Sequence, residues 1–159
     1  MSILSKIAAG LAITVALGAV PALADPLFTI RTADSARTLD VTADMMARVG
    51  SVTYRTILPG TDGAVHEVKG PLIQKLLDEA GIDAANYIAV ALDNYEIEVP
   101  AEDFKAHGAI AAVEVDGKAL TVRDKGPAWI VYPATDNPAL ADPLYESRSV
   151  WQLKELVAQ

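Results

Sequence analysis

The chain contains no cysteine among its 159 residues. Thiolate chemistry is therefore excluded, which rules out a cysteine nucleophile, a cysteine-ligated zinc site and an iron–sulfur cluster. Disulfide bonds are excluded as well, so any folded domain of this chain must be stabilised by its core alone.

Basic residues are scarce. The sequence has 13 Lys and Arg against 21 Asp and Glu, which gives a formal net charge of −8 at pH 7. Because an acidic protein is repelled by phosphate backbones and by anionic headgroups, we expect neither nucleic acid nor an anionic membrane surface as a partner.

The N-terminal apolar stretch is too short to span a bilayer. It follows one basic residue, Lys6, and runs from Ile7 to Val20, whereas a membrane-spanning helix needs about 20 residues. It is followed by Pro21 and an A-x-A-like site that ends at Ala24. This pattern predicts a secretory signal peptide over 1–24, a periplasmic location and no membrane insertion after cleavage. The remaining residues, 25–159, have the length of a single domain.

The pattern of 25–159 predicts an α+β, mainly β domain with one main helix. That helix is expected from Gly70 to Gly81, with Pro71 in its first turn, and a shorter helix is expected over 43–49 with Thr42 as its N-cap. A single helical turn is expected at 101–104, a surface loop at 136–143, and either strand or helix at 150–157. Strands are predicted at 28–31, 51–58, 64–68, 87–92, 95–99, 110–115, 120–122 and 128–132.

Few residues form a recognisable catalytic or metal-binding pattern. His66 and His107 are far apart in sequence and have no carboxylate cluster at ligand spacing, so we interpret them as scattered surface residues. Glu96 and Glu98 share one face of a predicted strand, which is typical of a solvated face. The segment Arg123–Pro127 has two interpretations that remain open: Arg123 and Lys125 hold an anion at the start of the following strand, or the segment is a solvated turn.

Five segments together resemble the oxidoreductase molybdopterin-binding (sulfite-oxidase-like) family. Gly70–Gly81 is similar to the family's G-x-x-L-x-x-L-L-x-x-A-G helix, and Tyr95–Pro100 to its tyrosine-bearing strand. Further similarities are Ile110–Leu120 to a hairpin, Arg123–Pro133 to the G-x-P-x-R-x-V-x-P strand, and Trp151 to a late tryptophan. The resemblance covers about Thr53 to Leu156 and implies the mixed sheets and single main helix of that family's fold.

The resemblance implies a molybdopterin cofactor whose metal is bound by one cysteine, but the corresponding segment here, Val52–Thr56, has no thiol. A threonine hydroxyl is a poor substitute for a soft thiolate. Trp129 stands near the family's arginine position and Lys125 at a common histidine position, whereas Tyr95 is kept. The family's enzymes generally cross the membrane folded through the twin-arginine route, but this N-terminus has only Lys6. We therefore expect no bound cofactor.

Three functions remain open. The first is a cofactor-free, non-catalytic module that binds a small anion and serves as a sensory or accessory subunit beside a membrane signalling or redox protein. Its pocket would be lined by Arg55, Tyr95, Arg123, Lys125 and Trp129.

The second is a molybdopterin-dependent oxidoreductase in which only the cofactor's own sulfurs hold the metal and Tyr95 lies near the reacting oxygen. The third is a structural protein that docks a partner through strand edges near Tyr54 or Trp151.

Overall fold

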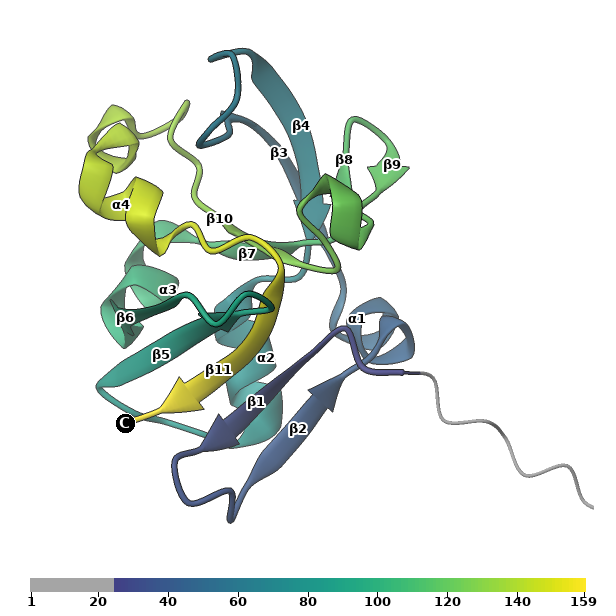
Figure 1. The fold of residues 1–159 in the computed structure, drawn as a ribbon, viewed down its shortest axis with the longest axis vertical. Coiled ribbons are helices and arrows are strands. Elements are labelled where there is room, and N and C mark those ends of the chain that lie inside the picture. The colour runs from purple at the N-terminus through teal and green to yellow at the C-terminus, as the bar shows by residue number, and fades with distance from the viewer. Residues whose placement is uncertain (1–24) are drawn as a thin grey trace, which may run out of the picture.

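Three β-sheets form the framework of the computed structural model, which describes residues 25–159 (Figure 1). The predicted signal peptide, 1–24, lies outside the described residues. The largest sheet has the strand order β2-β1-β11-β5-β6, and β1 and β11 are parallel whereas its other neighbours are antiparallel. Its strands are β1 (Phe28–Thr32), β2 (Thr38–Val41), β5 (Asn86–Ala91), β6 (Glu96–Pro100) and β11 (Leu153–Ala158).

The other two sheets lie above the five-stranded sheet in Figure 1. One is antiparallel with the order β3-β4-β8-β9, and the other pairs β7 with β10. Their strands are β3 (Val52–Ile57), β4 (Val65–Gly70), β7 (Ile110–Ala112), β8 (Glu114–Val115), β9 (Lys118–Ala119) and β10 (Trp129–Val131).

The helices are short and pack against the edges and one face of the sheets. The main helix, α2 (Ile73–Ala80), contacts β1, β2 and α3, and buries its apolar face in the core. Helix α4 (Pro143–Arg148) contacts β6. The remaining helical elements are α1 (Ala43–Val49), α3 (Ala101–His107), α4 (Pro143–Arg148) and two 3₁₀ turns, η1 (Val122–Asp124) and η2 (Pro138–Ala141).

Local sequence signals explain where several elements begin and end. The hydroxyl of Thr42 accepts a hydrogen bond from the Met45 N–H at 3.2 Å, which caps α1 as predicted. Gly81 ends α2 in the left-handed conformation, with φ +61°, which glycine adopts without steric cost.

Other predicted boundaries are wrong. The strand expected at 120–122 does not form, since β9 is Lys118–Ala119 and residues 122–124 form η1. The loop expected at 136–143 contains η2 and the start of α4, whose N-cap Asp142 accepts from the Leu144 N–H. The segment 150–157, for which strand and helix were both left open, contains most of the strand β11, Leu153–Ala158. The strand β2 was not predicted.

Gly70 fills a different role from the helix start expected of it. It ends β4, and α2 begins three residues later at Ile73. A Cβ atom at Gly70 would lie 2.0 Å from the backbone oxygen of Ala111 and 2.9 Å from the Cα of Ala112. The absence of a side chain at Gly70 therefore allows β4 and β7 to approach closely.

We predict that Gly70→Ala destabilises the protein by about 3 kcal/mol or more, because the neighbouring atoms are backbone and cannot move aside alone. Urea denaturation measures this loss. A matched variant is Gly117→Ala, where the added Cβ meets open space and only the positive φ of 73° is unfavourable, at about 1 kcal/mol. Equal losses in the two variants would contradict this account.

Candidate functional site

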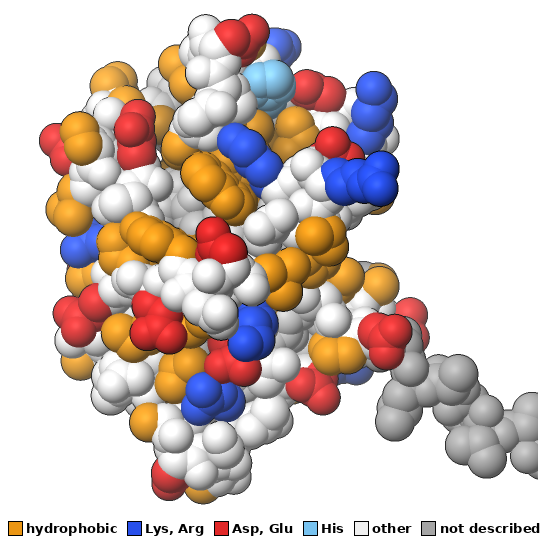
Figure 2. All heavy atoms as spheres, viewed as in Figure 1, with side chains coloured by type: hydrophobic (Ala, Val, Ile, Leu, Met, Phe, Trp, Pro, Cys, Tyr) orange, Lys and Arg blue, Asp and Glu red, His pale blue; other side chains and the backbone are white. Residues whose placement is uncertain are grey.

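One face of the molecule is hollowed between the five-stranded sheet and the upper sheets (Figure 2). Two cavities on this side contain residues singled out from the sequence. We call the first the lysine cavity; it has a volume of about 390 Å³ and is lined by Leu58, Thr61, His66, Val115, Lys118, Ala119, Leu120, Asp124, Lys125 and Trp129. We call the second the tyrosine pocket; it measures about 280 Å³ and is lined by Ala91, Asp93, Tyr95, Glu146, Ser147, Ser149, Val150 and Trp151.

The ammonium group of Lys125 is enclosed by aromatic rings. Its Nζ lies 4.5 Å from the ring centroid of Trp129 and 4.7 Å from that of Trp151, and it donates a hydrogen bond to the carbonyl of Pro59 at 3.2 Å. The two indoles meet edge to face, with centroids 6.2 Å apart. Cation–π attraction of this kind fixes the lysine in place, and burial lowers its pKa from the ordinary value of 10.5.

Backbone geometry aims these side chains. Lys125 has a left-handed backbone conformation, φ +69°, at the end of η1, and its carbonyl accepts from the Gln152 N–H at 2.8 Å. Trp129 starts β10, is 2% exposed, and its indole N–H donates to the Ser149 carbonyl at 3.0 Å. Because Gln152 follows Trp151, the hydrogen bond from the Gln152 N–H to the Lys125 carbonyl also fixes Trp151 to the turn at Lys125.

His66 projects from β4 into the lysine cavity. Its Nδ1 lies 2.8 Å from a carboxylate oxygen of Asp116, and this hydrogen bond lowers the pKa of Asp116, with smaller contributions from other groups that include Arg55. The buried Nε2 has no hydrogen-bond partner within residues 25–159. The cavity therefore contains one unpaired imidazole nitrogen beside the lysines, a feature that the sequence alone did not indicate.

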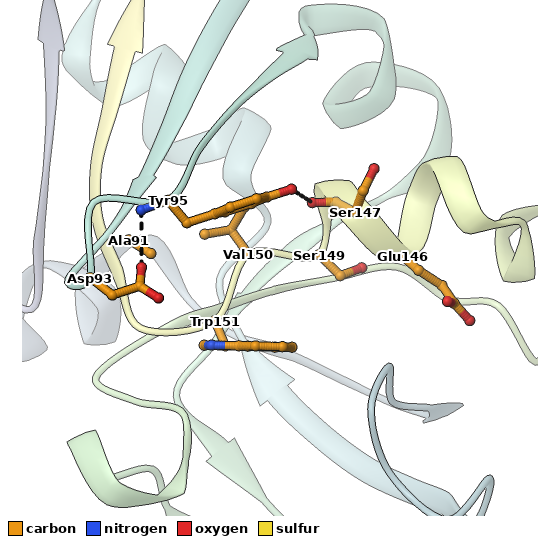
Figure 3. Close-up of a pocket in the computed structure, with 8 residues that line it drawn as sticks. All are labelled: Ala91, Asp93, Tyr95, Glu146, Ser147, Ser149, Val150 and Trp151. Carbon is orange, nitrogen blue, oxygen red and sulfur yellow. Dashed lines mark hydrogen bonds between the residues drawn. The ribbon is translucent and has the colours of Figure 1, made fainter.

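The tyrosine pocket combines aromatic rings with carboxylates (Figure 3). Tyr95 lies on the turn between β5 and β6, and its hydroxyl donates to the Ser147 carbonyl at the end of α4, at 3.1 Å. Asp93 accepts the Tyr95 N–H at 3.0 Å, which shapes the same turn. Trp151 lies on the opposite side of the pocket from Tyr95, and Glu146 lies at one end.

The structure brings together only part of the predicted pocket. Lys125 and Trp129 are in direct contact, and Tyr95 lines the neighbouring tyrosine pocket. Arg55 is exposed on β3 and Arg123 is exposed on η1, and neither lines either cavity. Side-chain direction separates these residues: Arg55 alternates with the buried Thr56 on its strand, so it faces away from the core.

Sequence reasoning missed several residues that line the two cavities, among them His66, Lys118, Asp93, Glu146 and Trp151 as a pocket wall. Asp93 stands at an ordinary turn, and Glu146 stands in the segment 144–149, for which no element was predicted, so no periodic signal marked them. Trp151 was noted only for the family resemblance and as a possible strand edge. Tyr54, the other suggested docking residue, is half-buried and donates its hydroxyl to the Val131 carbonyl at 2.7 Å.

A buried ion pair supports the helix that forms one wall of the tyrosine pocket. Arg148, the last residue of α4, donates to the carboxylate of Asp103 on α3 at 3.0 Å, and the hydroxyl of Tyr132 donates to the same oxygen at 3.2 Å. The side chains of Asp103 and Arg148 are 7% and 16% exposed. Burial, together with the adjacent Asp103 charge, raises the pKa of Tyr132 above its ordinary value, so its hydroxyl stays protonated.

The side chains of β3 do not fit a cysteine-ligated cofactor. In the segment Val52–Thr56, the Thr56 hydroxyl is fully buried, donates to the Tyr132 carbonyl at 3.0 Å and accepts from the Ala134 N–H at 3.0 Å. The Tyr54 hydroxyl is likewise bonded within the protein. The Tyr54 hydroxyl thus connects β3 to the last residue of β10, the Thr56 hydroxyl connects it to the segment that follows β10, and neither replaces the missing thiolate.

Nowhere in residues 25–159 do three or more His, Asp or Glu side chains gather as a metal ion would require. Among the described helices, none has the length and apolar character needed to cross a membrane.

We predict that Lys125→Met lowers the free energy of unfolding by about 1 kcal/mol, since the apolar stem is kept and the cation–π contacts are lost. Trp129 and Trp151 are the two tryptophans of the chain, so their emission reports directly on this group. Unchanged stability and unchanged emission would contradict the cation–π contacts between Lys125 and the two indoles.

The Trp emission of the wild type should also titrate at alkaline pH with a midpoint below 10.5, and Lys125→Met should lack this transition. The folded pKa is depressed, so the folded state binds fewer protons than the unfolded state between the two pKa values. Through that window, stability from this group increases as pH rises. A midpoint at or above 10.5 would contradict the lowered pKa.

We predict that Asp103→Ala destabilises the protein by about 3 kcal/mol, because the buried Arg148 charge loses its partner. Chemical denaturation measures the loss. The control is Glu79→Ala, which removes an exposed ion pair with Arg48 at 3.0 Å and should cost less than about 1 kcal/mol. Similar losses in both variants would show that burial does not decide the effect.

Comparisons with known proteins support the fold. No family model matches the chain, and no curated protein matches it. Solved structures do match, among them the crystal structure of the sulfane dehydrogenase SoxCD from Paracoccus pantotrophus, with a TM-score of 0.63 and 18% sequence identity. The match covers 89% of this chain and 40% of that chain, so this chain spans less than half of its length.

At 18% identity the similarity shows a distant relationship in fold alone. Together with the arrangement of strands and helices, it confirms the α+β, mainly β, sulfite-oxidase-like fold class that the sequence predicted.

Proposed function

We propose that the mature chain is a non-catalytic, periplasmic binding module that holds a small anion in the lysine cavity. The observation that carries the proposal is the unpartnered Nε2 of His66, which lines the same cavity as Lys118 and Lys125. Three side chains with nitrogen donors thus line one concave site.

The hydrogen bond between His66 and Asp116 supports this role. Asp116 occupies Nδ1, and the buried Nε2 has no hydrogen-bond partner within residues 25–159. An anion in the cavity would accept a hydrogen bond from this nitrogen in its N–H form. One carboxylate, Asp124, also lines the cavity, and one of its oxygens accepts the Thr121 hydroxyl at 2.7 Å.

Three observations favour binding without catalysis. The chain has no thiol, the Thr56 hydroxyl is used twice within the protein, and the N-terminus has no arginine pair for export in the folded state. Such a module would serve as a sensory or accessory subunit beside a membrane signalling or redox protein.

Anion binding is tested with inorganic sulfate, by comparing thermal unfolding with a chloride series at matched ionic strength. Saturating stabilisation is expected, which would reach about 2.7 kcal/mol at a hundred times the dissociation constant.

Lys118→Gln should weaken the sulfate effect, whereas Lys154→Gln, which removes the same charge from the exposed face of β11, should leave it intact. An equal response of the two variants, or the same response to chloride as to sulfate, would overturn the anion site.

Absence of a cofactor is tested separately on protein purified from its native periplasm. We expect molybdenum, tungsten and pterin well below one equivalent per chain. One equivalent of metal with pterin would contradict the non-catalytic proposal and favour the molybdopterin-dependent oxidoreductase.

A further inference from the structure

The tyrosine pocket has a charge opposite to that of the lysine cavity. Asp93 and Glu146 line it, and none of its described lining residues is Lys or Arg. The pocket is also mostly apolar between these two carboxylates, since Ala91, Val150 and two aromatic rings form its walls. A ligand that fits both properties is apolar in its body and positively charged.

Two exposed aromatic side chains line this pocket. Tyr95 is 45% exposed and Trp151 is 41% exposed, and both line the same cavity. Figure 3 shows Tyr95 and Trp151 on opposite sides of the space, with Val150 and Ser149 between them in this view. The pocket, which we call the slot, thus has an aromatic ring on each of two sides, which suits a flat group.

Both walls of the slot are fixed before any ligand arrives. Tyr95 is held through its hydroxyl by Ser147 and through its N–H by Asp93. Trp151 precedes Gln152, whose side chain donates to the Val122 carbonyl at 2.7 Å.

The backbone beside each ring is also unusual. Asn94, before Tyr95, has φ +65°, and Gln152, after Trp151, has φ +50°. Left-handed conformations are uncommon for residues other than glycine and cluster at ligand-binding sites.

We propose that the tyrosine pocket binds a small, flat organic cation, of the amidinium or guanidinium type, between Tyr95 and Trp151. Aromatic faces attract such cations, and a carboxylate pairs with their N–H groups. Asp93 uses one oxygen for the Tyr95 N–H, and Figure 3 shows the other on the side of the pocket. The volume of about 280 Å³ equals that of about nine water molecules, which limits the ligand to a small one.

This inference does not rest on the proposed anion site, because it concerns a different cavity with the opposite charge. The two cavities adjoin at Trp151 and Lys125, whose ammonium is already bonded to Pro59 and covered by indoles. The carboxylates Asp93 and Glu146 offset the positive charge of that lysine for a ligand in the pocket.

The test compares three probes of nearly identical shape: benzamidine, which is cationic, benzamide, which is neutral, and benzoate, which is anionic. Binding is measured by calorimetry and by Trp emission on the mature protein. We expect benzamidine to bind at least about tenfold more tightly than benzamide, the loss expected when one charge-assisted hydrogen bond is removed. Benzoate should not bind in this pocket, and sulfate should not displace benzamidine.

Charge variants locate the site. Asp93→Asn keeps the acceptor for the Tyr95 N–H while removing the charge, and should weaken benzamidine about tenfold. Glu98→Gln removes the same charge from an exposed position on β6 outside the pocket, and should change nothing. Tyr95→Phe keeps the ring and should retain most of the binding.

Any of the following results would overturn the proposal. The first is equal affinity for benzamidine and benzamide, which would indicate apolar stacking without charge recognition. The second is tighter binding of benzoate than of benzamidine. The third is no binding of benzamidine, or binding that Asp93→Asn and Glu98→Gln change equally. Each result is distinguishable from a failure of the sulfate experiment, which concerns Lys118.

Discussion

The enclosure of the Lys125 ammonium joins three parts of the chain that are far apart in sequence. Its partners are Pro59 in the loop after β3, Trp129 at the start of β10, and Trp151 just before β11. Each of these segments also forms a wall of a cavity. The positions of both cavities therefore depend on one partly buried charged group, and this burial lowers the pKa of Lys125.

That arrangement separates two chemically different spaces on one face of the molecule. On one side, Lys118 and the unpartnered Nε2 of His66 create a site for negative charge. On the other side, Asp93 and Glu146 flank two aromatic rings and create a site for positive charge. Because the net charge of the protein is −8, long-range attraction alone would favour the cationic ligand.

Much of the fold could be predicted from the sequence because local signals agreed with tertiary packing. Thr42 caps α1 and Gly81 ends α2 as expected, and the buried strands followed apolar runs. Prediction failed where long-range contacts decide the structure. Position 70 requires glycine because a Cβ there would collide with the backbone of Ala111, a residue 41 positions away. The short strands β8 and β9 have too few residues to show a pattern.

The candidate site was only partly predictable for the same reason. Tyr95, Lys125 and Trp129 stood at positions marked by the family resemblance, and each lines one of the two cavities. Arg55 was chosen by charge alone, but the alternation of β3 turns it away from the core. His66 is a candidate because its Nε2 has no hydrogen-bond partner among the described residues, and only the three-dimensional structure shows this.

The position of β11 has a consequence for how the chain folds. This strand, the last element of the described chain, lies in the middle of the five-stranded sheet and pairs in parallel with β1, so that Arg31 meets Glu155 across 124 positions. Until β11 is in place, β1–β2 and β5–β6 are two separate hairpins with open edges. A chain that emerges N-terminus first leaves one edge of β1 unpaired until residues 153–158 arrive, a period in which exposed strand edges invite aggregation.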